Sequence, residues 1–341
     1  MRMDTGMSQK EYSGAAQLRQ GVAYGGQAVI EGVMMRGRYK VAVAVRNPRG
    51  EIVVYEDSLN PAIYRSVWTE LPFVRGTVML WDAMSIGVRA LLWSAEIAAG
   101  IEKPTVDASA SLGVAAFSMS MSAGMVFLAP AIASSGLGRF LNLKNNTVVT
   151  VVEGLVRLGL VVSYIYALGQ TKEGSRLFAY HGAEHKTVNA LEAGAPLTPE
   201  SVRQFPLEHP RCGTAFLLTV MLLSTLVQVL IGRPRFSVLL LTRILLLPVI
   251  AGVAYEFIRF ASQNMQDPLV RAIIAPNLML QRLTTREPDL DQIRVAITAM
   301  ERVLAAEDEA AQNSSVSGGT NSNPEIIIPH VTVPSGNGHA K

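Results

Sequence analysis

The sequence predicts a mainly α-helical, polytopic membrane protein with about four transmembrane helices and a small α+β N-terminal domain in the cytosol. Hydrophobic residues make up 49% of the 341 residues and charged residues 17%, below the usual charged share of about 25%. No charged side chain occurs from Ala108 to Gly138. Because about 20 helical residues cross a hydrocarbon core of about 30 Å, we expect spans at about 110–132, 148–168, 213–232 and 237–258.

The first part of the chain is predicted to form a disordered arm at 1–22 and a folded cytosolic domain at 23–106. The arm contains no apolar stretch of signal-peptide length, so the internal apolar segments must direct membrane insertion. A helix is expected at 79–100, with a polar stripe and a broad apolar surface. This helix would lie either along the membrane interface or in the core of the N-terminal domain.

Two segments of the N-terminal domain are expected to be extended. Four glycines surround a short apolar run at 25–37, a pattern typical of close backbone packing or of a bulged strand. The runs at 41–46 and 52–55 are rich in β-branched residues and flank an Asn-Pro-Arg-Gly turn at 47–50. This pattern predicts a β-hairpin.

Loop charges predict the orientation of the membrane domain, which we place at 107–258. The loop at 170–212 carries more Lys and Arg than the loops on the opposite side, which places this loop and both termini in the cytoplasm. Cytosolic helices are expected at 259–308, where apolar residues from Ile293 to Leu304 repeat at helical spacing. The segment 309–341 is rich in Ser, Asn and Gly and is predicted to be a disordered tail.

Composition also excludes several functions. The net charge is +3 and no basic run is interleaved with aromatic residues, which argues against nucleic-acid binding. The chain has one cysteine, so it has no intrachain disulfide. Glu153, Arg157 and Arg243 lie inside predicted spans, where ionisable groups usually face a bundle interior. We interpret Glu153 and Arg157 as a local pair whose charges neutralise each other, rather than as part of a transport pathway.

The residues that carry chemistry lie in the 170–212 loop, on a helix expected from Ser175 to Ala193. His181 and His185 are four residues apart and share one helix face, and Glu184 points the same way. This is the His-x-x-Glu-His spacing of the inverted class of zinc proteases. We therefore predict His181 and His185 as ligands of Zn²⁺ and Glu184 as the general base acting on bound water.

A third metal ligand is needed, and the sequence offers several. His209 and Cys212 lie in the same loop, just before the third predicted span, and we prefer them. Glu192 could serve as a ligand or as a carboxylate behind the ligands. Glu256 could reach the site from the end of the fourth span, as the downstream carboxylate of inverted zinc proteases does.

Simpler roles must be weighed against this site. Histidines four residues apart are often surface residues, a lone cysteine beside a membrane is often a packing residue, and His209 before a proline can cap a turn. In the N-terminal domain we expect Glu31 to form an ion pair with Arg36. In the alternative, Glu31 and Arg75 complete the site.

At these motifs the chain resembles the YqhQ-like family of bacterial membrane proteins of unknown function, which are described as predicted metal-dependent enzymes. The resemblance runs from about Gly25 to Leu304 and implies an integral protein of the bacterial cytoplasmic (inner) membrane. It rests on the stretches GGQAVIEGVMMRG (25–37), PFVRG (72–76), YHGAEHKTVNALEAG (180–194), HPRCGTAF (209–216) and LQRLTTREPD (280–289).

Two functions of different class follow. The first is a metal-dependent, membrane-embedded hydrolase with zinc and an unknown substrate. The second is a non-enzymatic membrane scaffold or regulator with a structural metal, whose loop and amphipathic C-terminal helix bind a cytosolic partner. Neither the substrate nor the oligomeric state can be inferred from the sequence.

Overall fold

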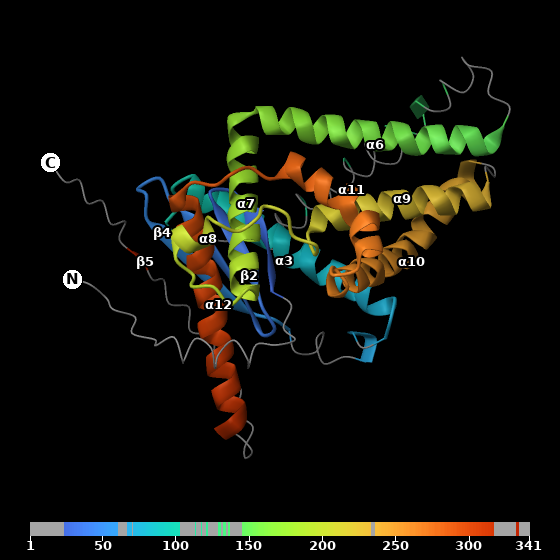
Figure 1. Cartoon of the computed structure of the whole chain (residues 1–341). Coiled ribbons are helices and arrows are strands. Elements are labelled where there is room, and N and C mark those ends of the chain that lie inside the picture. Colours follow the sequence, from blue (N-terminus) through green and yellow to red (C-terminus); the bar gives the residue numbers. More distant parts are fainter. Residues whose placement is uncertain are drawn as a thin grey trace.

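The computed structural model describes residues 24–60, 67–69, 71–102, 145–232, 236–316 and 332–333, with isolated residues between 113 and 136. In these residues a small β-sheet lies at one end of the molecule, and three long helices, α6, α9 and α10, run side by side away from it (Figure 1). Within the described residues four helices are long and apolar enough to span a membrane, which indicates a membrane protein. The predicted mainly α-helical class with a small α+β N-terminal domain is confirmed.

The sheet is antiparallel and its strands follow the order of the chain. Arg46 at the end of β3 pairs with Ile52 at the start of β4, which confirms the predicted hairpin. The glycine-rich segment forms a second hairpin, in which Val29 pairs with Gly32 across a two-residue turn. The strands are β1 (Gly25–Val29), β2 (Gly32–Arg36), β3 (Lys40–Arg46), β4 (Ile52–Ser58) and the short β5 (Thr332–Val333).

Both faces of the sheet are buried, because apolar residues occupy both sets of alternating positions in β2 and β3. Helices α7 (Lys172–Glu192) and α12 (Leu290–Val316) cover one face, with Val33, Met35 and Ala42 in that core. The C-terminal half of α3 (Val74–Ala98) covers the other face. The domain therefore has two apolar cores, one on each side of the sheet.

Helix α3 decides between the two placements expected for 79–100. Ile86, Ala90, Trp93 and Ile97 are buried against the sheet, so this half of the helix lies in the core of the domain. The N-terminal half packs on α10 instead. The helix is also one of the four candidate spans found among the described residues, because a stretch of it long enough to cross a membrane has a mean hydropathy of 1.2.

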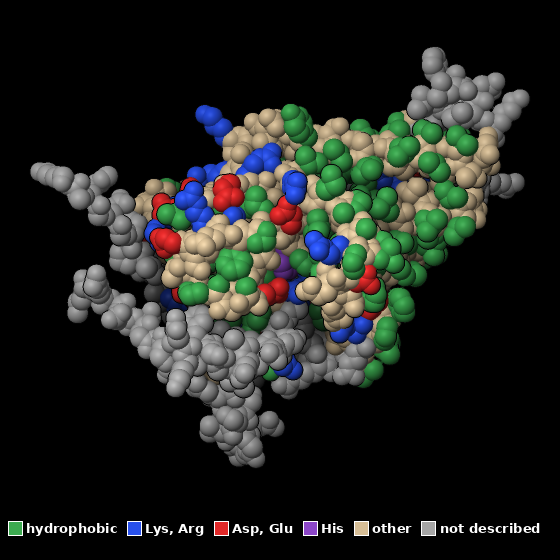
Figure 2. Space-filling view, viewed as in Figure 1, with side chains coloured by type: hydrophobic (Ala, Val, Ile, Leu, Met, Phe, Trp, Pro, Cys, Tyr) green, Lys and Arg blue, Asp and Glu red, His purple; other side chains and the backbone are tan. Residues whose placement is uncertain are grey.

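Three predicted spans correspond to helices of the structure. These are α6 (Asn146–Gln170), α9 (Gly213–Ile231) and α10 (Phe236–Gln263). Exposed hydrophobic side chains cover this part of the molecule, whereas charged side chains gather mainly over the sheet domain and its junction with the helices (Figure 2). The span predicted at 110–132 lies largely outside the described residues.

The ionisable residues inside the spans form one cluster. Arg157 Nη2 donates to Glu153 Oε1 at 3.1 Å, which confirms the expected local pair. Arg243 of α10 bonds the same carboxylate oxygen and also donates to Gln228 Oε1 of α9 at 2.9 Å. The cluster therefore connects α6, α9 and α10. It lies at the ends of these helices that are far from the sheet, since the opposite end of α6 leads directly into α7, which packs on the sheet.

The C-terminal part contains α11 (Pro268–Thr284) and α12. The predicted apolar repeat is confirmed, because Ile293, Met300 and Val303 are fully buried against the sheet. Helix α12 continues to Val316, past residue 309 where the tail was expected to begin, because alanine and glutamate there are good helix formers. The predicted arm at 1–22 and the rest of the tail, apart from β5, lie outside the described residues.

The contact between α7 and β1 gives a test of the packing. A Cβ atom added at Gly26 would overlap the carbonyl oxygen of Met34 and lie 2.9 Å from Glu184 Cγ, whereas one added at Gly25 would meet nothing within 4 Å. We expect Gly26→Ala to destabilise the protein by about 1–3 kcal/mol through overpacking. The measurement is thermal unfolding in detergent, with Gly25→Ala as the matched control, and equal melting temperatures for the two variants would contradict this packing.

Candidate metal centre

Helix α7 carries the His-x-x-Glu-His motif. It begins at Lys172, three positions before the predicted start, because the Thr171 side chain accepts a hydrogen bond from the Gly174 backbone N–H at 3.0 Å and caps the first turn. The rings of His181 and His185 lie 4.4 Å apart between centroids. The predicted placement of both imidazoles on one helix face is therefore confirmed.

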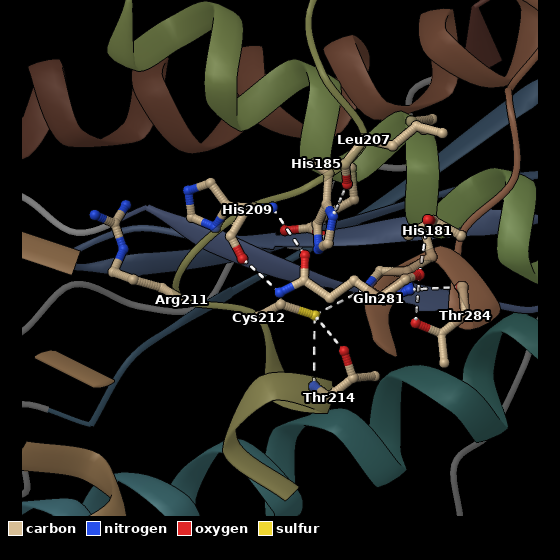
Figure 3. Close-up of polar contacts among 12 residues, drawn as sticks. His181, His185, Leu207, His209, Arg211, Cys212, Thr214, Gln281 and Thr284 are labelled. Atoms are coloured by element: carbon tan, nitrogen blue, oxygen red, sulfur yellow. Dashed lines mark hydrogen bonds and ion pairs between the residues drawn. The ribbon is translucent and has the colours of Figure 1, made fainter. Parts of the chain in front are cut away.

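Backbone carbonyls hold both imidazoles. His181 Nδ1 lies 2.9 Å from the Thr284 carbonyl oxygen at the end of α11, and His185 Nδ1 bonds the Leu207 carbonyl oxygen (Figure 3). A carbonyl oxygen can only accept, so each Nδ1 carries the proton and each Nε2 keeps a free lone pair in the neutral ring. The same arrangement orients histidines that bind metals through Nε2.

Cys212 completes a group of three possible ligands. Its Sγ lies 3.3 Å from His181 Nε2, and one ligand atom from each of His181, His185 and Cys212 lies within 4.8 Å of the other two. The thiol is positioned by the start of α9, where it lies 3.4 Å from the Thr214 backbone nitrogen. His185 Nε2 is buried and has no hydrogen-bond partner in the described residues, so this group of possible ligands contains a buried polar atom that is not satisfied.

His209, the other preferred third ligand, lies beside this group. Its ring centroid is 5.8 Å from that of His185, and its Nε2 is 3.5 Å from a Glu192 carboxylate oxygen. The backbone of His209 is held by Gln281, which accepts from the His209 N–H at 2.9 Å and donates to its carbonyl oxygen at 2.8 Å. Of the two residues ranked equal from the sequence, the structure brings Cys212 to the pair of histidines.

The three candidate carboxylates have different surroundings. Glu184 is 4% exposed and its Oε2 lies 3.5 Å from His185 Nε2, so it borders the same space as the ligand atoms. Glu192 is bonded by Arg211. Glu256 is held by Arg75, whose Nε lies 2.7 Å from Oε1, and it is not among the three residues whose ligand atoms converge.

The ion pairs that Glu31 and Arg36 form differ from those expected from the sequence. Glu31 has a positive φ of 56°, which turns its side chain toward α7, where Arg176 binds both carboxylate oxygens. Arg36 lies 3.4 Å from Asp82 instead. The expected Glu31–Arg36 pair and the alternative of Glu31 with Arg75 at the site are therefore both wrong.

Several groups that support the centre were not found from the sequence. The carbonyls of Leu207 and Thr284 belong to the backbone, so no residue type marks them. Gln281 and Thr284 do lie in the LQRLTTREPD stretch, which supports the family resemblance but does not by itself indicate any chemistry.

An open groove of about 730 Å³ lies elsewhere, at the junction of α6 and α7. Lys172, Arg176, Ala179 and Arg286 are among its lining residues. At about 100° per residue, Ala179 and His181 point to nearly opposite sides of α7. The groove is therefore separated from the metal centre by the helix itself.

The pKa of Glu192 gives a test of the loop that closes the centre. Burial raises this pKa most strongly, but the contacts with His209 and Arg211 together outweigh burial and hold it below its ordinary value of 4.5. The folded pKa is thus lower than the unfolded one, so the ionised carboxylate stabilises the fold above about pH 4.5, and this contribution is lost as the pH falls through the lowered pKa.

We therefore expect Glu192→Gln to lower the melting temperature at pH 7 and to narrow its difference from the wild type as the pH approaches 3. Melting curves recorded between these pH values measure this effect. The control is Glu309→Gln, at an exposed position near the end of α12. A difference between wild type and Glu192→Gln that stays constant with pH would contradict the assignment.

Comparison with known proteins agrees with the resemblance seen in the motifs. Residues 71–306 match the family described as "Protein of unknown function (DUF1385)". The chain is 31% identical over 314 residues to the "Uncharacterized protein YqhQ" of Bacillus subtilis (strain 168), covering 86% of this chain and 96% of that protein. No solved structure matches the chain. The chain therefore belongs to the DUF1385 family of proteins of unknown function.

Proposed function

We propose that the protein is a metal-dependent hydrolase of the bacterial cytoplasmic membrane, with both termini in the cytosol. His181, His185 and Cys212 would bind Zn²⁺, and Glu184 would act as the general base. The observation that carries this proposal is the convergence of two imidazole nitrogens and one thiol, with ligand atoms within 4.8 Å of one another. The substrate class stays open.

The chemistry of the three side chains fits zinc. Zinc binds imidazole nitrogen at about 2.0–2.1 Å and thiolate at about 2.3 Å, which places the ligand atoms of a tetrahedral site about 3.4–3.6 Å apart. The 3.3 Å between Cys212 Sγ and His181 Nε2 is already close to that separation. Movement of about 1 Å by the His185 ring would bring the third atom to the same range. Three protein ligands leave one position for water, as in catalytic zinc sites.

Glu184 is suited to take a proton from a group bound at this centre. Its carboxylate is buried, borders His185 Nε2, and has no Lys or Arg partner in the described residues. A carboxylate without a cation partner is free to accept a proton. A bound zinc ion would supply the nucleophile, since it lowers the pKa of water to about 7.

The second candidate is a structural metal in a membrane scaffold or regulator. The observation in its favour is burial, because His185 is 1% exposed and Cys212 6%. A metal there would join α7 to the start of α9 and stabilise the junction of the sheet domain with the spans. The apolar face of α12 covers the sheet of its own chain, so a cytosolic partner that binds this helix would contact its polar face.

Metal content tests the ligand set. Full-length protein purified in detergent and supplied with zinc should retain about one equivalent per chain, measured by elemental analysis. His181→Ala, His185→Ala and Cys212→Ala should each lose it, because each removes one of three ligands. His209→Ala is the matched control and should retain zinc. A zinc-free wild type, or loss in His209→Ala with retention in Cys212→Ala, would contradict the assignment.

Glu184→Gln separates the two functions. The variant keeps all three ligands, so it should retain zinc. If Glu184 is the general base, hydrolysis of peptide, carboxyl-ester or phosphoester reporters by the purified protein should fall by about 10²–10⁴-fold. Glu173→Gln, at the exposed start of α7, is the control. Unchanged hydrolysis in Glu184→Gln would rule out its role, and a zinc-loaded wild type that hydrolyses none of the reporters would favour the structural metal.

A further inference from the structure

Helix α11 has an unusual distribution of side chains. Three of its four buried residues are polar, namely Asn277, Gln281 and Thr284, and the fourth is Ile274. Its exposed side is apolar, with Leu269 68%, Ile273 54% and Met279 66% exposed. A helix on the surface of a soluble domain buries its apolar face and exposes its polar one. In α11 this order is reversed.

The buried polar side is fixed by hydrogen bonds, so the helix cannot rotate to hide its apolar side. Asn277 Nδ2 donates to Thr219 Oγ1 of α9 at 3.0 Å. Gln281 makes two bonds to the backbone of His209, and the Thr284 carbonyl holds the His181 ring. Rotation of α11 would break this set of buried bonds and leave their donors and acceptors without partners.

The position of α11 brings its exposed side beside the spans. The helix packs on α9 and α6 and runs across their ends next to α7 (Figure 1). Large apolar side chains are also exposed on α9 and α10, among them Leu217, Leu222 and Phe260. The apolar side of α11 therefore belongs to the same part of the molecule as the lipid-facing surface of the candidate spans.

The length of α11 excludes a further span. Its 17 residues extend about 25 Å, less than the hydrocarbon core of about 30 Å. Pro268 begins the helix and Pro276 interrupts its hydrogen bonds. Arg271 and Arg282, eleven positions apart, project within about 20° of each other at about 100° per residue and form a separate basic edge.

From these observations we propose that α11 is an interfacial helix seated in the bilayer surface on the side of α7. Leu269, Ile273 and Met279 enter the acyl chains, and Arg271 and Arg282 lie among the phosphates of anionic lipid headgroups. Arg282 also pairs with Glu208 at 2.8 Å, and 71% of its side chain stays exposed to reach a headgroup. The segment 259–308, expected to be wholly cytosolic, thus contains a membrane-bound helix.

The consequence concerns the place of the metal centre. Because the inner side of α11 holds His181 and His209, the outer side of the same helix would place that centre next to the lipid boundary. The inference does not depend on a bound metal or on catalysis, since it rests on the orientation of α11 alone.

Fluorescence of introduced tryptophans tests the proposal in the full-length protein. Ile273→Trp and Met279→Trp are prepared in phosphatidylcholine–phosphatidylglycerol vesicles, and the emission of the native protein is subtracted. Bromine atoms on the acyl chains should quench the added emission at least about twofold, because the indole would lie in the acyl region. Aqueous iodide should have little effect. Arg294→Trp, on the exposed side of α12, is the matched control and should show the reverse pattern.

Each other outcome overturns the proposal. Quenching of both introduced tryptophans by iodide and not by bromine would place this side of α11 in water. Protection from both quenchers would mean that a protein surface, such as a second copy of the chain, covers it. Far-ultraviolet circular dichroism confirms that the variants fold, and both substitutions are at exposed positions where tryptophan meets no core.

The same experiment also tests the basic edge formed by Arg271 and Arg282. In Met279→Trp, removal of phosphatidylglycerol should weaken quenching by brominated chains, because Arg271 and Arg282 lose their anionic partners. Adding Arg271→Gln and Arg282→Gln should abolish that dependence on lipid charge. Dependence that persists without both arginines would contradict their role. None of these readings involves zinc or hydrolysis, so failure here is distinct from failure of the proposed function.

Discussion

Two backbone carbonyls constrain the centre of this molecule. The oxygens of Thr284 and Leu207 each accept a hydrogen bond from the Nδ1–H of a histidine on α7, and this fixes the ring orientation and tautomer of His181 and His185 together. His181 Nε2 then lies 3.3 Å from the Cys212 thiol, and the two imidazoles and the thiol each place a ligand atom within 4.8 Å of the others. A hydrogen bond to a carbonyl in a buried site is costly to break, because the carbonyl would be left without a partner. The pair of histidines is therefore held ready for a ligand that accepts two nitrogen lone pairs.

Helix α7 connects this centre to both halves of the protein. On one side Gly26 lets β1 approach Glu184 closely, and the Glu31–Arg176 ion pair attaches the first hairpin to the helix. Tyr180 is buried at the same contact, and burial together with the charge of Glu31 raises its pKa to about 12. On the other side α7 continues from α6 and meets the start of α9. A change in how the sheet domain sits on α7 would therefore move the ligands relative to Cys212.

Two clusters of polar side chains among the described residues of the membrane part have different roles. The cluster of Glu153, Arg157 and Arg243 lies at the far ends of the candidate spans. It joins α6 to α10 through ion pairs and α10 to α9 through a hydrogen bond to Gln228. The cluster around Gln281 and Asn277 lies next to the candidate metal centre and fixes α11. Because an ion or amide in an apolar medium must be bonded to a partner, each cluster allows few arrangements of its helices. The first stabilises the bundle, and the second positions α11 and His209.

The sequence by itself determined the fold class, the spans at α6, α9 and α10, the hairpin of β3 and β4, and the shared helix face of His181 and His185. These features follow from the periodicity of apolar residues and from the length of apolar stretches, and both can be recognised within a single segment of the chain. Only the tertiary structure placed Cys212 beside the two histidines, paired Glu31 with Arg176, and paired Glu256 with Arg75. It also showed that α11 buries its polar side. Each of these depends on contacts between segments far apart in the chain or on backbone carbonyls, whose positions no pattern of residue types encodes.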